Sequence, residues 1–178
     1  GEAELTWPQF LDDYSNGTQK KKYSDQTIDI SKSPVPRYDL LDLNGFNLVP
    51  MQTTRGCPIA CKFCSVTTVF GPKFRVKGLN QLELELDEIR KFAPNKQIVF
   101  NDDNMFVWRK KSYEILEMLK GHNIRYFAES DISIAEDDKL LKLMRDSGCV
   151  MVFLGLESLV PENLAKMNTN KWKLKKLK

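Results

Sequence analysis

The chain has 178 residues, of which 42% are hydrophobic and 29% are charged, a balance typical of a soluble globular protein of about one domain. No apolar run approaches the roughly 18 residues that a membrane-spanning helix needs, and the start GEAELTWPQF lacks the features of a secretory signal. We therefore expect no transmembrane segment and a cytoplasmic location. The net charge of +3 owes much to the lysine-rich end at 171–178, and no basic surface interleaved with aromatic residues appears elsewhere, so nucleic-acid binding is not indicated.

The first part of the chain is predicted to hold one short helix and a linker. Thr6 is a candidate N-cap, and the helix is expected to end at Asn16. A polar stretch at 18–33 follows, and Pro34 and Pro36 then favour an extended connector. This segment is typical of a linker from a preceding domain.

From residue 46 onward, apolar strands alternate with amphipathic helices. Each connection is long enough for a crossover, which predicts a parallel sheet with helices packed on it, an α/β fold. A further helix is expected to start at Pro161. The predicted strands are 46–53, 97–101, 124–128 and 150–154. The predicted helices between them are one that Asn80 caps and that ends at Pro94-Asn95, one at 108–120 and one at 136–147.

Three of the four cysteines form a Cys-x3-Cys-x2-Cys pattern at Cys57, Cys61 and Cys64, directly after the first strand. Thiolates select iron–sulfur clusters, zinc or copper(I), and three of them leave one position of a tetrahedral site open. The single histidine, His122, and the remaining cysteine, Cys149, lie far along the chain, so a zinc ligand set is incomplete. A 4Fe-4S cluster bound by three thiolates and a zinc-binding structural module both remain as interpretations.

Polar side chains follow each of the other three strands. Because the carboxyl ends of parallel strands meet at one edge of a sheet, where α/β proteins place their active sites, these side chains are expected to lie together. Turn formation, helix capping or a salt bridge at the rim would explain the same residues without a ligand. The candidates are Asp102, Asp103 and Asn104 after the second strand, Ser130 and Asp131 after the third, and Glu157 after the fourth.

The cysteine loop, with Arg55, Gly56, Pro58 and Phe63 around the cysteines, resembles the cluster loop of radical S-adenosylmethionine (SAM) enzymes. The longer string TTRGCPIACKFCSV followed by FGPKFR resembles, more narrowly, the subgroup that carries a cobalamin-binding domain ahead of the radical domain. NDDNMF and FLGLES are similar to the motifs that follow two of the later strands in the same family.

This resemblance implies an architecture. Residues 46–178 would be the N-terminal part of a radical SAM core, a partial (βα) barrel of about four parallel strands with flanking helices. Residues 1–45 would be the C-terminal remnant of a cobalamin-binding domain with its linker, so the chain would be a fragment of a longer enzyme. Strand four would then be left with an open edge, which is an aggregation liability unless another segment pairs with it.

The resemblance also implies cofactors, partners and a reaction. The cofactors are a 4Fe-4S cluster on the three cysteines, SAM, and, left open by the sequence, cobalamin. An electron donor such as flavodoxin or ferredoxin would supply the electron that cleaves SAM to a 5′-deoxyadenosyl radical. The radical would act on an unactivated carbon of a small-molecule substrate, leading to cobalamin-dependent methylation or rearrangement. SAM would be bound by Phe63, Asp102, Asp103, Asn104, Ser130, Asp131 and Glu157, and no catalytic residue is predicted.

Alternatives to this interpretation remain open. The chain could be a non-catalytic remnant or a piece of a split enzyme that needs a partner chain, and the zinc-binding module is the third possibility. Arg55 is either a structural anchor or a group that neutralises cluster charge. Lys73 and Arg75 are expected on a solvated strand edge, His122 on the surface, and Cys149 as a small packed hydrophobic residue.

Overall fold

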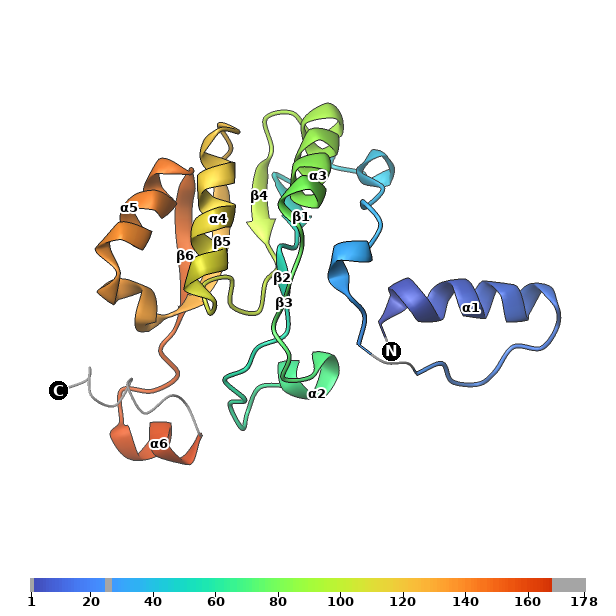
Figure 1. The fold of residues 1–178 in the computed structure, drawn as a ribbon, viewed down its shortest axis with the longest axis horizontal. Helices are drawn as coiled ribbons and strands as arrows, with labels where there is room; N and C mark the ends of the chain where they lie inside the picture. The colour runs from blue at the N-terminus through green and yellow to red at the C-terminus, as the bar shows by residue number, and fades with distance from the viewer. Residues whose placement is uncertain (1, 25–26, 168–178) are drawn as a thin grey trace.

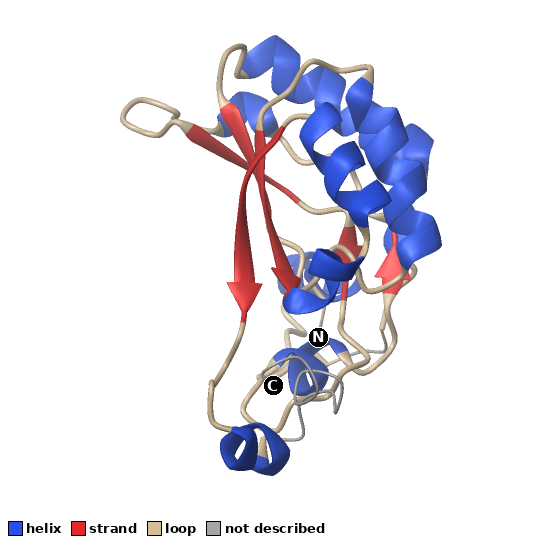
Figure 2. Cartoon of the chain, turned by 90° about the vertical axis from the view of Figure 1, so that its left-hand side faces the viewer, coloured by secondary structure: helices blue, strands red, loops and turns tan. Residues whose placement is uncertain are grey.

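The computed structural model describes residues 2–24 and 27–167, and its centre is a four-stranded parallel sheet with the strand order β1-β4-β5-β6 (Figure 1). Figure 2 shows that the helices gather on one side of this sheet. The predicted α/β fold is therefore confirmed. The strands are β1 (Leu48–Met51), β4 (Gln97–Phe100), β5 (Tyr126–Asp131) and β6 (Cys149–Gly155).

Three crossover helices connect these strands and form the core with them. They are α3 (Leu79–Phe92), α4 (Arg109–Lys120) and α5 (Asp138–Asp146), and a short 3-10 helix, η3 (Ile132–Glu136), precedes α5. Their apolar side chains recur at helical spacing and pack against the strands, as the sequence periodicity predicts. The fully buried contacts come from Leu82 and Leu86 in α3, Ile115, Leu116 and Leu119 in α4, Leu140 in α5, and Ile98, Phe100 and Tyr126 in the sheet.

The cysteine loop is not a simple excursion from the first strand, and the predicted strand 46–53 is too long. The chain leaves the sheet after Met51, and β2 (Thr54–Arg55) pairs antiparallel with β3 (Arg75–Val76). This two-stranded ribbon closes the base of the loop that holds the cysteines and the short helix α2 (Val66–Phe70). The ribbon escaped prediction because a pairing over two residues leaves almost no pattern in the sequence.

The N-terminal helix, α1 (Ala3–Ser15), begins before Thr6, so the predicted N-cap is wrong. Glu2 stands at the N-cap in an extended conformation, and the Thr6 hydroxyl donates a hydrogen bond to the Glu2 carbonyl oxygen at 3.0 Å. Two 3-10 turns, η1 (Ile30–Lys32) and η2 (Tyr38–Leu40), interrupt the connector.

The two edges of the sheet differ. β1 carries Pro50, which has no N–H to offer a further strand, whereas β6 exposes Met151, Phe153 and Leu154. After β6 the chain enters α6 (Pro161–Lys166), which starts at the predicted proline. No helix among the described residues is long and apolar enough to cross a membrane. The lysine-rich segment 171–178 lies outside the described residues.

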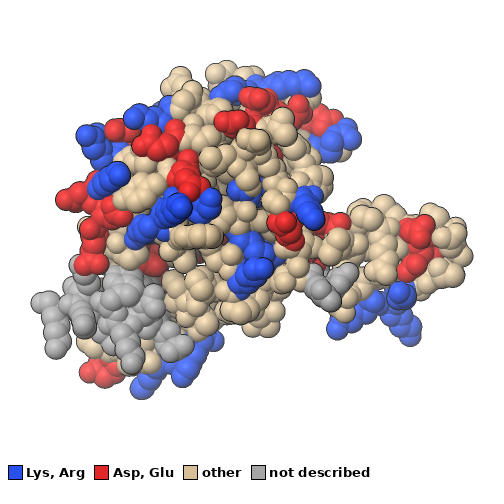
Figure 3. Space-filling model, in the orientation of Figure 1, with Lys and Arg blue, Asp and Glu red and all other residues tan. Residues whose placement is uncertain are grey.

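Acidic and basic side chains are interspersed over the face shown in Figure 3.

Candidate functional site

A cavity of about 420 Å³ lies between the cysteine loop and the carboxyl ends of β4, β5 and β6. The parallel register aligns these ends, since Ser130 pairs with Leu154 and Asp131 with Gly155. The cavity brings together every predicted site residue except Asp102. Its lining comprises Cys57, Ile59, Cys61, Phe63, Cys64, Asp103, Asn104, Glu129, Ser130, Asp131, Phe153, Leu154, Gly155 and Glu157.

One wall of the cavity holds three partly buried cysteines that form no disulfide, Cys57, Cys61 and Cys64. A tight turn holds the last two together, with the Cys64 amide donating to the Cys61 carbonyl oxygen at 3.0 Å. Burial raises the pKa of the Cys57 thiol, and the neighbouring Cys61 and Asp103 raise it further. Thiol ligands bind metals in their deprotonated form, so a bound metal would offset the negative charge of the thiolate that this site otherwise disfavours.

The three thiols are the kind of donor that an iron–sulfur cluster needs. Within residues 2–24 and 27–167, no three cysteine, histidine, aspartate or glutamate side chains are grouped so that they could hold a single ion. A cluster makes a different demand, because each thiolate binds a different iron and the sulfurs need not converge on one point. Three soft donors on one wall of a shared cavity meet that demand.

The opposite wall is acidic. It contributes the carboxylates of Asp103, Glu129, Asp131 and Glu157, and the described residues that line the cavity include no lysine, arginine or histidine. Four carboxylates in one lining favour a ligand that carries positive charge.

Local hydrogen bonds position the acidic wall. The Asp103 Oδ2 accepts from the Gly56 amide at 2.9 Å, which ties the end of β4 to the start of the cysteine loop. The Asn104 side-chain amide donates to the Asp131 Oδ2 at 2.9 Å, which links the ends of β4 and β5. Glu157 has a left-handed backbone with a φ of 63°, an uncommon conformation that recurs at functional sites.

Asp102 lies behind this wall, not in it. Its side chain is 1% exposed, and its Oδ1 accepts from the amide and hydroxyl of Thr53 at 3.1 and 3.0 Å. It also accepts from the amide and, at 2.5 Å, the hydroxyl of Thr54. Burial raises the pKa of Asp102 to about 6, although these hydrogen bonds act in the opposite direction. Asp102 thus holds Thr53 and Thr54 at the start of the ribbon, and it does not face the cavity.

Sequence reasoning left out several residues of the cavity. Glu129 belongs to the same Glu-Ser-Asp string as two predicted residues, so its acidity and position were a usable signal. Phe153, which is 56% exposed, and Leu154 read as ordinary strand residues, and only the topology shows that they border the cavity.

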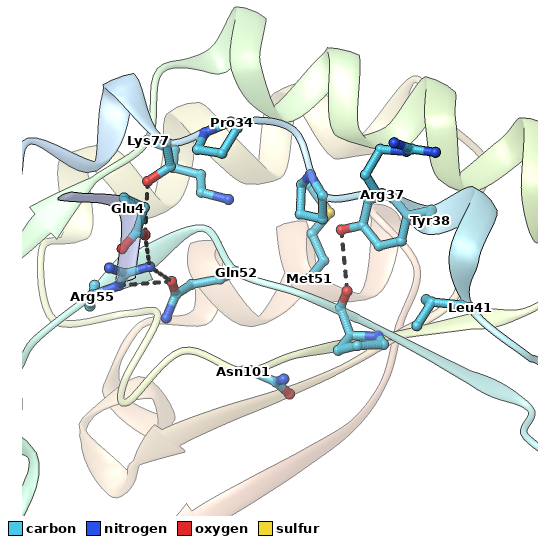
Figure 4. Close-up of a pocket in the computed structure, with 13 residues that line it drawn as sticks. Glu4, Pro34, Arg37, Tyr38, Leu41, Met51, Gln52, Arg55, Lys77 and Asn101 are labelled. Carbon is cyan, nitrogen blue, oxygen red and sulfur yellow. Dashed lines mark hydrogen bonds and ion pairs between the residues drawn. The ribbon is translucent and has the colours of Figure 1, made fainter. Parts of the chain in front are cut away.

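A second cavity, of about 510 Å³, lies between the connector and β1 (Figure 4). Its walls are mainly apolar, and the charged groups in it already have partners. Arg55 donates to Glu4 at 2.7 Å, and Lys77 donates to Glu85 at 2.6 Å. The remaining cation of this lining, Arg37, is paired with a neighbouring aspartate. This second cavity therefore has mainly apolar walls and paired charges, whereas the first has an acidic wall.

Four further residues can now be placed. Arg75 is 7% exposed and ion-paired with Glu2, so the expected solvated strand edge is wrong for it, while Lys73 is exposed. Cys149 packs against the core and His122 contacts Arg90, both away from the cysteine cavity.

Known proteins are similar to this chain in sequence and in fold. The model of the radical SAM superfamily matches residues 51–178. An uncharacterised methyltransferase of Synechocystis sp. is 32% identical over 92% of this chain and 32% of its own length. The bacteriochlorophyllide d C-8(2)-methyltransferase of Chlorobaculum tepidum is 29% identical over 94% of this chain and 41% of its own length. The chain thus spans about a third to two fifths of these curated relatives.

Solved structures agree on the fold. The cobalamin-dependent SAM radical enzyme OxsB, with aqua-cobalamin and SAM bound, superposes with a TM-score of 0.77 at 19% identity, over 97% of this chain and 30% of OxsB. The radical SAM methyltransferase TsrM from Kitasatospora setae superposes with a TM-score of 0.64 at 16% identity, over 71% of this chain and 25% of TsrM. On the family match, this chain belongs to the radical SAM superfamily.

Proposed function

We propose that the chain binds a 4Fe-4S cluster through Cys57, Cys61 and Cys64 and binds SAM between that cluster and the acidic wall. The observation that carries the proposal is the composition of one cavity, with three cysteines on one side and the carboxylates of four acidic residues on the other. SAM carries a sulfonium and an ammonium group, so its positive charges suit this wall.

The chain's own residues would share the work of binding. Asp103, held by the Gly56 amide, is placed to attract the ammonium group. Glu157 can accept hydrogen bonds from the two ribose hydroxyls. Phe63, on the cysteine loop, can shelter the site from water. When bound and reduced, the cluster supplies one electron that cleaves SAM to methionine and a 5′-deoxyadenosyl radical.

We further infer that the whole protein is a cobalamin-dependent enzyme that methylates an unactivated carbon of a small molecule. Support comes from the names of the relatives, which include methyltransferases, and from the similarity of the chain to OxsB along nearly its full length. The resemblance of residues 1–45 to the end of a cobalamin-binding domain supports the same assignment. Rearrangement is the competing outcome, and the substrate-binding residues would come from segments outside this chain.

Anaerobic reconstitution with iron and sulfide tests the proposal. We expect a brown protein with about four irons per chain. Cys61→Ala should lose most of this iron, whereas Cys149→Ala should keep it, because Cys149 lies away from the cavity. A colourless protein with one zinc per chain, or full iron retention in Cys61→Ala, would overturn the cluster assignment.

Assaying 5′-deoxyadenosine after chemical reduction separates the two remaining alternatives. A chain that forms the cluster and cleaves SAM holds a working radical-generating site. A chain that forms the cluster without cleavage is a piece that needs a partner segment or chain. Restoration of cleavage by adding the rest of the protein would identify a split enzyme.

A further inference from the structure

The segment around the cysteine loop has an unusual charge distribution. Residues 43–82 contain five lysines and arginines and no aspartate or glutamate. In the ribbon, Arg55 lies directly opposite Arg75, and like charges in directly opposed positions destabilise a strand pair. The ribbon therefore needs carboxylates from other parts of the chain.

Glu2 supplies the central carboxylate. Its Oε1 and Oε2 accept from the Arg75 Nη2 and Nη1 at 2.7 and 2.8 Å, a bidentate pair. Its Oε2 lies 3.6 Å from the Arg55 Nη1 and accepts from the Ile28 amide at 2.9 Å. Glu2 is only 9% exposed, so this contact is shielded from solvent.

The two arginines stand at the two ends of the cysteine loop. Arg55 comes two residues before Cys57, and Arg75 is the first residue of the returning strand. Arg75 also donates to the Phe70 carbonyl oxygen at 3.1 Å, at the end of α2. A carboxylate that binds both arginines therefore fixes the distance between the ends of the loop.

We propose that Glu2 is a positioning residue for the cysteine loop. The N-cap of α1 would then help to hold the cysteines in place for the cluster. The inference rests on the proposed cluster function. Without the Glu2 charge, Glu4 is the one carboxylate within residues 2–24 and 27–167 that remains paired with the two facing guanidinium groups, and Arg55 already engages it at 2.7 Å. Removing one partner of a buried ion pair is costly, whereas removing both can be nearly neutral.

Hydrogen exchange of the iron-free chain is the first test. In Glu2→Gln we expect the Gly56 and Lys77 amides, which bond to Asp103 and to the Thr53 carbonyl oxygen, to exchange about tenfold faster than in the parent chain. Exchange in β4 and β5 should stay unchanged. Asp12→Asn, which removes an exposed carboxylate from α1, the helix that Glu2 precedes, is the matched control and should change neither.

A double variant that removes both charges shows whether the faster exchange in Glu2→Gln comes from the unpaired charge or from lost packing. In Glu2→Gln/Arg75→Gln only one guanidinium remains at the base, and Glu4 pairs with it, so exchange at Gly56 and Lys77 should return toward the parent value. Unchanged exchange in Glu2→Gln, equal loss of protection in β4 and β5, or no rescue in the double variant would each overturn the proposal.

The loaded protein supplies an independent readout. After anaerobic reconstitution, a chelator should remove iron from Glu2→Gln several-fold faster than from the parent chain or from Asp12→Asn. Equal rates would overturn the positioning role. Failure of the parent chain to bind iron would instead overturn the proposed function, and the exchange experiment would still decide whether Glu2 closes the loop.

Discussion

The base of the cysteine loop and the cavity above it handle charge in opposite ways. At the base, Arg55, Arg75 and Lys77 all have buried or partly buried carboxylate partners at 2.7 Å or less. In the cavity, carboxylates from three strand ends line the wall, and the described lining residues include no basic side chain. The base therefore uses its charges for structure, whereas we propose that the acidic wall attracts a positively charged ligand. Substitutions at the base should change stability, and substitutions in the wall should change binding.

The largest effect is expected at the buried pair of Lys77 and Glu85, whose side chains are 5% and 0% exposed. Lys77→Met leaves the Glu85 carboxylate without its cation, which should lower the free energy of unfolding by about 3–5 kcal/mol. Lys91→Met, which breaks an exposed pair with Glu88, should change it by less than about 0.5 kcal/mol. Urea unfolding of both variants measures these changes. Equal losses of unfolding free energy would show that the buried ion pair at the base contributes no more to stability than an exposed pair.

The raised pKa of Asp102 predicts that the stability of the chain depends on pH. Its pKa in the folded chain is about 6 against an ordinary value of 3.8, so the folded state binds the proton more tightly than the unfolded state. Its contribution to stability is then fully present below pH 3.8 and is lost as the pH rises to about 6, a change of about 3 kcal/mol.

Asp102→Asn is the matched variant, because an amide oxygen can still accept from Thr53 and Thr54. The difference in unfolding free energy between the parent chain and this variant should fall between pH 4 and 6 and stay flat above. The comparison is needed because Arg75, despite the opposing effect of burial, lowers the pKa of Glu2, which gives a pH dependence of the opposite sign. A flat difference, or one that rises with pH, contradicts the account.

Alanine substitutions at two glycines distinguish the cost of a steric clash from the cost of a left-handed backbone conformation. Gly56 and Gly45 have nearly the same left-handed φ, 87° and 86°, but a Cβ on Gly56 would stand 2.5 Å from the Lys73 carbonyl oxygen, whereas one on Gly45 meets nothing within 4 Å. Both alanine variants share a conformational cost of about 1–2 kcal/mol. Gly56→Ala should lose at least about 1 kcal/mol more, measured by thermal unfolding, since backbone must move. Equal losses would mean that the two ends of the loop do not touch.

The smallest change in stability, with a clear change in binding, is expected in the wall. Asp103→Asn can keep the hydrogen bond to the Gly56 amide and removes only the charge. We expect SAM affinity to fall about tenfold, equivalent to about 1.4 kcal/mol, with little change in melting temperature. Calorimetric titration of the reconstituted chain measures this, with Asp12→Asn as the control. Unchanged affinity would remove Asp103 from the proposed site.

The strands and crossover helices could be predicted because each has its own apolar periodicity, as in 97–100 and 109–120. The gathering of polar side chains at one sheet edge followed from parallel topology. Adjacent carboxylates could not be told apart: Asp102 is enclosed by Thr53 and Thr54 whereas Asp103 reaches the cavity, a difference that depends on the path of the chain after β4.

The base of the loop was beyond prediction for a different reason. The contact of Glu2 with Arg75 joins residues 73 positions apart, and neither has a local pattern that indicates burial. An arginine in a strand of two residues is expected to be solvated, and only the three-dimensional arrangement reveals its partner. Charges paired over long distances in sequence are thus the part of this fold that composition and periodicity leave undetermined.

Electron paramagnetic resonance of the reconstituted, reduced chain, before and after addition of SAM, tests the proposed site most directly. We expect a 4Fe-4S signal that changes when SAM is added, because the cosubstrate binds in the cavity beside the three cysteines. The signal should be lost in Cys61→Ala and kept in Cys149→Ala. A 4Fe-4S signal that SAM leaves unchanged, or no cluster signal at all, would contradict the binding of SAM at this cluster.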